Sequence, residues 1–427
     1  MRRDVLYSLA AAAAHNGGRL VAVLLLAKLA SADVLGAYTY ALSLITPLVL
    51  LAGLEVRPAF VSDVRGLFSY GCYARARSAG LTFAAVGVAA LAAAEGLRRG
   101  DLAAALLIAG VGAGRIAWST SELAWGVFQR HERFDRIALA SLLRGAAQAV
   151  TFGIPVLVAA YSSTGHPHGP SMRYAAVCAV WGCAAAWTLV HVLMEQRATS
   201  REPGLDHQAA WTDVRRLAVQ TLPLGLVQLL IALCDTVPRV WIASAGHAGL
   251  EQLGYFGALA YVALAVQLGL VAVATGASHR LALYYHAAPH EFRRLAWRLV
   301  LLALLAGAAV LLLSWLGGRW LLATLYRPEY AAHFPAFMLL MLAQCVAFPA
   351  GVFGFAVTSM RRFWVQGAIH VTVLAVTVVA SAVLVRGPDP VLGAAWVAVV
   401  RSATQALLYA ACVGHALRRM RTPASGD

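Results

Sequence analysis

Charged residues are scarce in this chain. Asp, Glu, Lys and Arg make up only 12% of its 427 residues, while 61% are hydrophobic. A soluble globular domain carries about twice that share of charge, roughly 25%. The composition therefore excludes a soluble fold and indicates an integral membrane protein.

Lysine is almost absent. Lys28 is the only lysine among 34 basic residues, which outnumber the 19 acidic ones and give a formal charge of +15. In a soluble chain this balance would indicate nucleic-acid binding. In a membrane chain the positions of the arginines explain it better, because arginine-rich loops stay on the cytoplasmic side. We expect no nucleic acid as a partner.

Motifs for cofactors are missing as well. The chain has no GxxxxGK[ST] phosphate loop, so the sequence does not indicate nucleotide hydrolysis. Its six cysteines are scattered without a CxxC pair, which argues against disulfides and zinc sites. We expect no cofactor, no metal and no enzymatic activity.

Apolar runs of about 20 residues, the length that spans a bilayer, recur along the whole chain. They predict an all-α polytopic membrane protein with twelve transmembrane helices, of which the first is retained and not cleaved as a signal peptide. The predicted spans are residues 5–30, 36–58, 79–97, 102–124, 138–161, 174–195, 217–244, 253–276, 297–317, 333–358, 364–385 and 391–416.

The arginines predict the orientation of these spans. An even number of spans places both termini on one side, and 22 basic residues fall in the segments on that side. Both termini are therefore predicted to be cytoplasmic, and the loop with His166 to face outward. The opposite side holds seven basic residues, namely Lys28, Arg98, Arg99, Arg173, Arg319, Arg327 and Arg386.

The two halves of the chain resemble each other. Leu35-Gly36-Ala37-Tyr38 follows Arg19 of the first span, and Leu253-Gly254-Tyr255-Phe256 follows Arg239 of the seventh. Two sets of six spans that enter from the same side form a parallel repeat, and we expect a ligand site where the repeats meet. The predicted domains are an N-terminal six-helix lobe (1–195), a cytoplasmic linker (196–216), a C-terminal six-helix lobe (217–416) and a cytoplasmic tail (417–427).

Arg19 is the strongest candidate for a ligand-binding residue. At mid-bilayer a guanidinium stays protonated and costs roughly 2.5 to 17 kcal/mol, depending on the method. His15 lies four residues before Arg19 and Asn16 is beside it, so the three share one helical face. Because that helix offers no acid within reach, the pattern predicts a cationic cavity for an anionic ligand.

A second polar face lies in the seventh span, where Gln228, Asp235 and Arg239 recur at intervals of seven and four. Pro223 in the same span predicts a bent helix. Asp235 is placed to pair with Arg239, so Arg239 is either a ligand-binding residue or half of a structural ion pair. Arg401 in the last span completes the candidate substrate-binding residues.

Two further arginines within spans have a simpler interpretation. Arg115 shares a helical face with Glu122, and Arg144 shares one with Gln148. We interpret both pairs as contacts that hold helices together within the N-terminal lobe.

Short motifs follow one another from the first span to the last. They are Asp63-Val64-Arg65-Gly66 with Tyr70-Gly71, Tyr73 and Arg77; Gln129-Arg130-His131-Glu132 with Asp135-Arg136-Ile137-Ala138; Leu222-Pro223-Leu224-Gly225; Pro238-Arg239; Arg280-Leu281-Ala282; Leu325-Tyr326 with Glu329-Tyr330-Ala331; and Gly393-Ala394-Ala395. In order and spacing the chain resembles the oligosaccharide-repeat (O-antigen and capsular polysaccharide) flippase family of the multidrug/oligosaccharidyl-lipid/polysaccharide exporter superfamily.

This resemblance implies a MATE-like, V-shaped transporter with two six-helix lobes in the bacterial plasma (inner) membrane. It implies a substrate, an oligosaccharide repeat unit linked to undecaprenyl diphosphate, that is flipped to the outer leaflet for O-antigen, capsule or exopolysaccharide assembly. Alternating access would occur around an Arg-lined central cavity. The implied partners are membrane lipids, Na⁺ or H⁺ as a coupling ion, and the polysaccharide polymerase. Asp235 and His279 depart from the family, where Asn and Pro are more usual.

Other functions fit the sequence less well. An ion-coupled drug exporter of the same fold needs acids in its cavity, and Asp235, the only clear acid at mid-membrane, has its own arginine. A flippase for lipid-linked peptidoglycan precursors usually has two further helices. A membrane glycan polymerase or ligase, which is an enzyme, tends to have a large outer loop, and the outer segments near 161–173 and 317–332 are short.

Overall fold

The computed structural model describes residues 2–63, 66–162, 170–200, 202, 205–246, 248–287, 289–359 and 363–419. These residues are helical and contain no strand. The loop with His166, parts of the predicted linker and most of the predicted tail lie outside the described residues. The helices are α1 (Arg2–Leu29), α2 (Ala32–Gly53), α3 (Val56–Ser62), α4 (Tyr70–Arg99), α5 (Leu102–Arg130), α6 (Phe134–Ser162), α7 (Pro170–Val190), a π-helix (His191–Gln196), α8 (Arg197–Thr199), α9 (Trp211–Ala243), α10 (Gly249–Ala287), α11 (Pro289–Leu325), a 3₁₀ helix (Pro328–His333), α12 (Phe334–Ser359), α13 (Phe363–Leu384) and α14 (Pro390–Arg419).

Twelve helices in the described residues are long and apolar enough to cross a membrane, which confirms the predicted fold class. Several continue beyond the predicted spans. A bilayer core of about 30 Å needs about 20 residues at 1.5 Å per residue, whereas α11 has 37. The additional turns carry arginines. A span predicted from hydropathy stops at an arginine, whereas the helix itself continues through it.

The boundary between the third and fourth spans depends on two residues. Gly100 has φ +62 and ends α4, which suits glycine because it has no Cβ. The Asp101 carboxylate then accepts hydrogen bonds from the N–H groups of Ala103 and Ala104 and caps the start of α5. The prediction of two helices here is correct.

The second span is broken, whereas the sequence predicted one continuous helix over 36–58. α2 ends at Gly53, and both Leu54 (φ 49) and Glu55 (φ 48) have left-handed backbone conformations before α3 begins. Such conformations cost about 1–2 kcal/mol for residues other than glycine. The surrounding packing must therefore hold the break in place.

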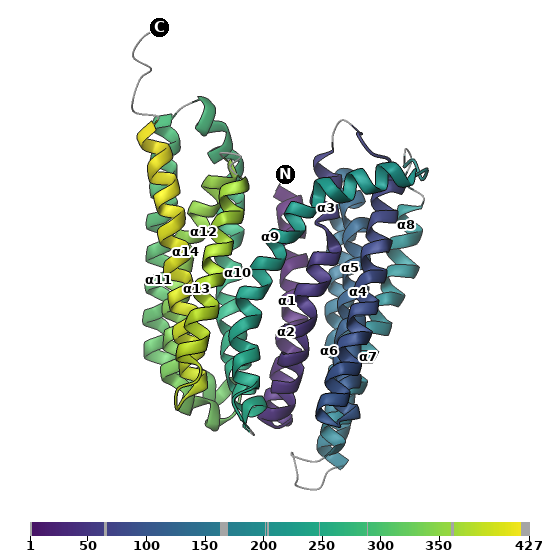
Figure 1. The fold of residues 1–427 in the computed structure, drawn as a ribbon, viewed down its shortest axis with the longest axis vertical. Coiled ribbons are helices and arrows are strands. Elements are labelled where there is room, and N and C mark those ends of the chain that lie inside the picture. Colours follow the sequence, from purple (N-terminus) through teal and green to yellow (C-terminus); the bar gives the residue numbers. More distant parts are fainter. Residues whose placement is uncertain are drawn as a thin grey trace. The chain divides into compact units, whose positions relative to one another are not determined.

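The chain divides into two compact units, Met1–Thr236 and Val237–Asp427, and the division falls within α9. In the first unit, α5 packs against α2, α3, α4 and α7, as its place in the bundle in Figure 1 suggests. The predicted domain boundaries at 195 and 216 remain predictions.

Loops predicted to share a side of the membrane contact one another in the first unit. At one end of the bundle, Arg130 donates to the Asp63 carbonyl, and Arg136 pairs with Glu202 at 2.7 Å. At another, Arg173 pairs with Asp33 and Asp101, at 3.1 and 3.4 Å. The alternation of loops therefore agrees with the predicted spans. Which end faces the cytoplasm remains a prediction, as does the location of both termini.

The segment 205–209, which we call the strap, is fastened to the start of α4. The Gly71 N–H donates to the Asp206 carbonyl at 2.9 Å. Ser69 donates to the Gln208 carbonyl, and Arg75 donates to the Ala209 carbonyl. A Cβ on Gly71 would lie 2.2 Å from the His207 carbonyl oxygen, so this contact requires glycine.

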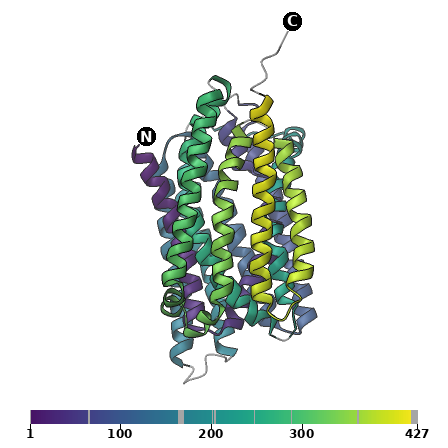
Figure 2. The ribbon, with the colours of Figure 1, turned by 90° about the vertical axis from the view of Figure 1, so that its left-hand side faces the viewer.

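The second unit is built around α12, which packs against α10, α11 and α14. Figure 2 shows the green to yellow helices of this unit running roughly parallel to one another. Its core includes the tyrosines of two predicted motifs. Tyr326 and Tyr330 are almost fully buried, Tyr326 donates to the Ala258 carbonyl at 2.9 Å, and Tyr255 meets Tyr330 edge to face.

Candidate functional site

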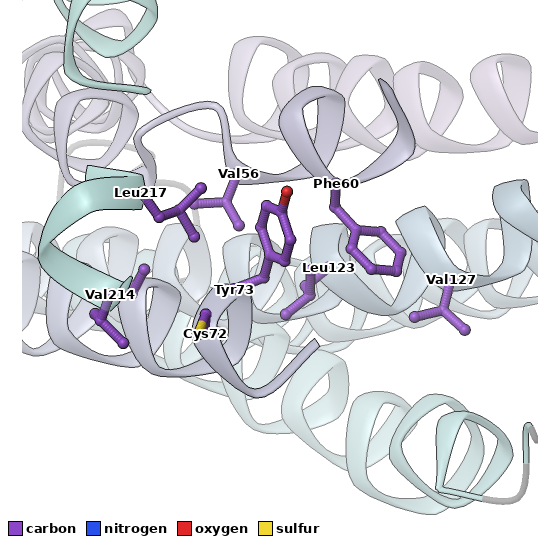
Figure 3. Packing of buried hydrophobic residues seen from close by; sticks show 9 residues of the cluster. Val56, Phe60, Cys72, Tyr73, Leu123, Val127, Val214 and Leu217 are labelled. Atoms are coloured by element: carbon purple, nitrogen blue, oxygen red, sulfur yellow. The ribbon is translucent and has the colours of Figure 1, made fainter. Parts of the chain in front are cut away.

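α3 is oriented by a hydrophobic cluster on one of its faces. Val56 and Phe60, four residues apart, are buried against α4, α5 and α9, and Figure 3 shows Phe60 and Tyr73 within this cluster. The rings of Phe60 and Tyr73 meet edge to face at 5.2 Å. This packing directs the next face of α3, which carries Arg57 and Val61, toward a cavity. The other cluster residues are Cys72, Ala76, Leu123, Val127, Val214 and Leu217.

The cavity lies within the first unit, and α2, α3, α4 and α5 line it. Its volume is about 540 Å³, which is within the range of roughly 300–1,000 Å³ that is usual for ligand pockets. Its lining combines both signs of charge with an amide, in the residues Glu55, Arg57, Arg77, Arg115, Glu122 and Gln129.

Arg77 serves the architecture of this cavity. Only 4% of its surface is exposed. It donates to the Gly53 carbonyl at 2.8 Å and to the Ser119 carbonyl at 2.9 Å, and it pairs with Glu122. Gly53 is the last residue of α2, so its carbonyl has no partner in its own helix. Arg77 therefore closes the broken end of α2 and neutralises Glu122.

Three other lining residues form fewer hydrogen bonds to the protein than Arg77 does, namely Glu55, Arg57 and Gln129. Arg57 donates to the Gln129 side chain at 3.1 Å and lies over the Trp125 ring. Among the described residues, none forms a hydrogen bond or ion pair with the half-buried Glu55 carboxylate, although the charges of Glu122, Arg77 and Arg57 act on it. Arg115 also lines the cavity and donates to Thr46 at 2.8 Å.

His15 lies beside this cavity, and Arg19 lies one helical turn farther along α1. His15 stacks on Trp118, a cavity residue, with ring centroids 3.7 Å apart. The charges of Arg19, Arg115 and Arg144 all act on His15. Arg19 is half-buried and forms no hydrogen bond or ion pair with the described residues. Three arginines are thus near enough to His15 for their charges to act on it, and we call the four residues the cationic cluster, in which Arg144 is paired with Glu195.

Arg144 does not pair with Gln148, the partner that the sequence predicted. Arg144 pairs with Glu195 at 3.0 Å, and both side chains are only 1% exposed. Glu195 also accepts from the Trp125 indole at 2.7 Å, and His191 lies 2.9 Å from it. Gln148 is buried too, but its Oε1 has no hydrogen-bond partner among the described residues. Arg144 does hold helices together, by a contact of α6 with the π-helix.

The remaining predicted site residues lie elsewhere. The Asn16 amide donates to the Ala12 carbonyl of its own helix at 2.8 Å. In α9, Gln228 is half-buried and Asp235 is exposed. Arg239 is half-buried, and its Nε is buried without a hydrogen-bond acceptor among the described residues.

Arg401 lies in the second unit, where its charge acts on His370 of α13. The His370 ring is 3.2 Å from the Tyr409 hydroxyl. Within the described residues, no group of three His, Cys, Asp or Glu side chains is arranged for a metal ion.

Asp63 organises the loop between α3 and α4. Its carboxylate accepts hydrogen bonds from the N–H groups of Leu67 and Phe68 and from the Tyr73 hydroxyl, at 2.9, 3.2 and 3.0 Å. Burial by itself would raise the pKa of Asp63, but these hydrogen bonds and the charge of Arg130 outweigh it and lower the pKa below its usual range. The ionised carboxylate fixes the loop that leads into α4.

Three acids lie in the cavity or the core of the first unit, and from the sequence only Glu122 was interpreted as a contact between helices. Glu55 and Glu122 line the cavity, and Glu195 is buried, so Asp235 is not the only acid within a segment long enough to span a membrane. The sequence placed Glu195 at the last position of the sixth predicted span, where its apolar run ends. Arg77 lies outside the predicted third span, 79–97. Its place in a helix could have been recognised, because the helix continues without a break from Tyr70 to Arg99.

No family model and no curated protein sequence matches the chain. Solved structures match it over nearly their full length. They include an inward-facing multidrug-resistance MATE transporter of the MOP superfamily (14% identity, 96% of each chain covered, TM-score 0.66). The lipid II flippase MurJ, inward closed, is 11% identical over 96% of this chain and 87% of that one, with a TM-score of 0.69. A MOP-superfamily transporter from Pyrococcus furiosus is 13% identical over 99% and 96%, with a TM-score of 0.64. The chain is a multi-pass membrane protein with the fold of these transporters.

Proposed function

We propose that this protein is a flippase in the bacterial inner membrane. Its substrate is an oligosaccharide repeat unit linked to undecaprenyl diphosphate, which it moves to the outer leaflet for assembly of a surface polysaccharide. The observation that carries this proposal is Arg19. It is a half-buried guanidinium within a membrane span, without a protein partner among the described residues, in a cluster with His15, Arg115 and Arg144.

The chemistry of the cluster suits a diphosphate. Guanidinium groups bind phosphate oxygens through two parallel N–H donors, which an ammonium cannot do. An unpaired charge inside a membrane is costly, and an anionic ligand removes that cost when it binds. Arg239 and Arg401, which lie in the second unit, are proposed as further substrate-binding residues.

The structural neighbours support transport over catalysis. One is a flippase for a lipid-linked substrate and others are multidrug exporters. We therefore propose alternating access between the two leaflets, with Na⁺ or H⁺ as the coupling ion. The polysaccharide polymerase is the proposed protein partner.

The test is a deletion strain complemented with variants of this chain. Without the protein, the surface polysaccharide should disappear and the lipid-linked intermediate should accumulate, as measured by mass spectrometry of the lipid extract. Failure of the intermediate to form would contradict the proposal, because the protein would then act upstream of the flip.

Arg19→Ala should abolish export while the protein still inserts, because it removes the charge that binds the diphosphate. Arg19→Lys should restore only part of it, since the ammonium keeps the charge but loses the paired donors. Arg98→Ala is the matched control, because the Arg98 side chain is 61% exposed and its partner Glu95 retains Arg99. Full export by Arg19→Ala would refute this role for Arg19.

A second candidate is an ion-coupled exporter of small cationic compounds. The Glu55 carboxylate favours it, because an acid without a protein partner is able to bind a cation. In that case the deletion strain would keep its surface polysaccharide and become sensitive to cationic drugs.

A further inference from the structure

The cavity in the first unit shares Arg115 with the cationic cluster, but the rest of its polar lining differs chemically from that cluster. Arg77 and Glu122 neutralise each other within its wall. Among the groups with hydrogen-bonding capacity left are the Glu55 carboxylate and the pair formed by Arg57 and Gln129. These are an acceptor, a donor and an amide that both donates and accepts. Such a wall suits a ligand rich in hydroxyl or acetamido groups better than a simple anion or cation.

Glu55 is held toward this cavity by the fold. Its backbone has a left-handed conformation with φ 48, which residues other than glycine rarely adopt. Val56 and Phe60 fasten the chain on one side of it, and Arg77 fastens Gly53 on the other. Backbone strain that the surroundings enforce is typical of ligand-binding sites. The carboxylate that results has no donor from the described residues, so a ligand hydroxyl is able to fill that place.

Trp118 connects this cavity to the cationic cluster. Its side chain lines the cavity and also stacks on His15, which lies one helical turn before Arg19. A substrate whose diphosphate is bound at Arg19 would therefore present its attached sugars to the neighbouring cavity. We infer that the cavity lined by Glu55, Arg57 and Gln129 is a saccharide subsite, which binds the sugars of the lipid-linked substrate apart from its diphosphate. This assignment rests on the proposed function.

The test separates the two halves of the ligand. One probe is the oligosaccharide released by mild acid from the lipid-linked intermediate that accumulates in the deletion strain, and the other is inorganic diphosphate. Binding of each to the purified full-length protein is measured by titration calorimetry. The variants are Glu55→Asn, because Asn tolerates the left-handed conformation, and Gln129→Ala, which lies on a regular helix. Glu95→Ala, at the far end of α4, is the matched control.

Glu55→Asn and Gln129→Ala should each weaken oligosaccharide binding about tenfold or more, which is the effect of losing a hydrogen bond to a charged or buried group. Diphosphate binding should change by less than about twofold. Arg19→Ala should do the reverse, and Glu95→Ala should change neither. Should Glu55→Asn elute as aggregate in gel filtration, Gln129→Ala decides.

Two results would overturn the subsite while leaving the flippase proposal intact. In one, the wild-type protein binds diphosphate and not the oligosaccharide at millimolar concentration. In the other, it binds both, and the cavity variants bind the oligosaccharide as the wild type does. Absence of any lipid-linked intermediate in the deletion strain would instead refute the proposed function itself.

Discussion

The ion pair between Arg144 and Glu195 offers a direct test at the residue scale. Removal of one member of a fully buried pair leaves the other charge without compensation and costs about 3–5 kcal/mol. Arg144→Gln should therefore lower the melting temperature of the detergent-solubilised protein sharply. Arg144→Gln combined with Glu195→Gln should recover much of the loss, because no charge is then left buried. Equal melting temperatures for Arg144→Gln and the double variant would show that the charge left on Glu195 is not what destabilises the single variant.

Arg239 calls for the same type of double variant with a different readout. If Arg239 binds substrate, Arg239→Gln together with Asp235→Asn should yield a protein that folds and does not export glycan. If the two form only a structural ion pair, the double variant should recover both folding and export. Protein yield in the membrane and surface polysaccharide, measured in one strain, distinguish the two roles.

The sequence predicts which polar residues lie at membrane depth better than it predicts their partners. Arg19, Arg115 and Arg144 are recognisable because an arginine within an apolar run requires a reason. Helical spacing predicted Gln148 as the partner of Arg144, because spacing relates only residues of the same helix. The partner, Glu195, comes from a helix that follows 51 residues later. Such pairings depend on how helices pack, which periodicity does not contain.

At the scale of elements, the strap makes a prediction about Gly71. Gly71→Ala would place a methyl group against the His207 carbonyl and displace the strap from α4. Limited proteolysis should then cleave within residues 196–216 several times faster than in the wild type. Gly317→Ala is the control, because nothing lies within 4 Å of its added Cβ. Unchanged cleavage in Gly71→Ala would show that the contact does not hold the segment.

The strap also changes the expected location of flexibility. The sequence offered two places for movement between the halves, namely the linker, which contains Pro203 and Gly204, and the bent seventh span. The structure fastens residues 205–209 of that linker to α4, and Pro223 and Pro238 both lie within the single helix α9. We therefore expect that any bending occurs within α9, after the strap.

The break between α2 and α3 was beyond reach from the sequence. Apolar residues continue through Leu54, and neither Leu54 nor Glu55 signals a left-handed turn. The break exists because Arg77 binds the free end of α2 and the hydrophobic cluster holds α3, and both contacts come from residues distant along the chain.

For the whole molecule, the arginine distribution predicts which side faces the cytoplasm. A reporter fused after Arg136 should behave as cytoplasmic, and one fused near His166 as exported, because the short loops with most arginines are retained. Activity of paired phosphatase and fluorescent-protein fusions measures this. Location of the His166 fusion in the cytoplasm would contradict the orientation of the first unit.

The fold as a whole followed from simple quantities. Twelve runs of sufficient length and hydropathy correspond to twelve helices, because a membrane requires each span to satisfy its own backbone hydrogen bonds. The candidate site followed only in part. Arg19 and His15 were identified within α1, whereas the cavity beside His15, with Glu55 and Arg57, depends on the broken second span and could not be anticipated.

The scarcity of lysine has a practical consequence at Lys28. This residue lies in the last turn of α1, is exposed, and is the only lysine of the chain. Apart from the N-terminal amine, an amine-reactive dye therefore has one attachment point in the native protein, at the end of the helix that carries His15 and Arg19. A fluorophore placed there would report on the first helix during a transport cycle without any cysteine having to be introduced or removed.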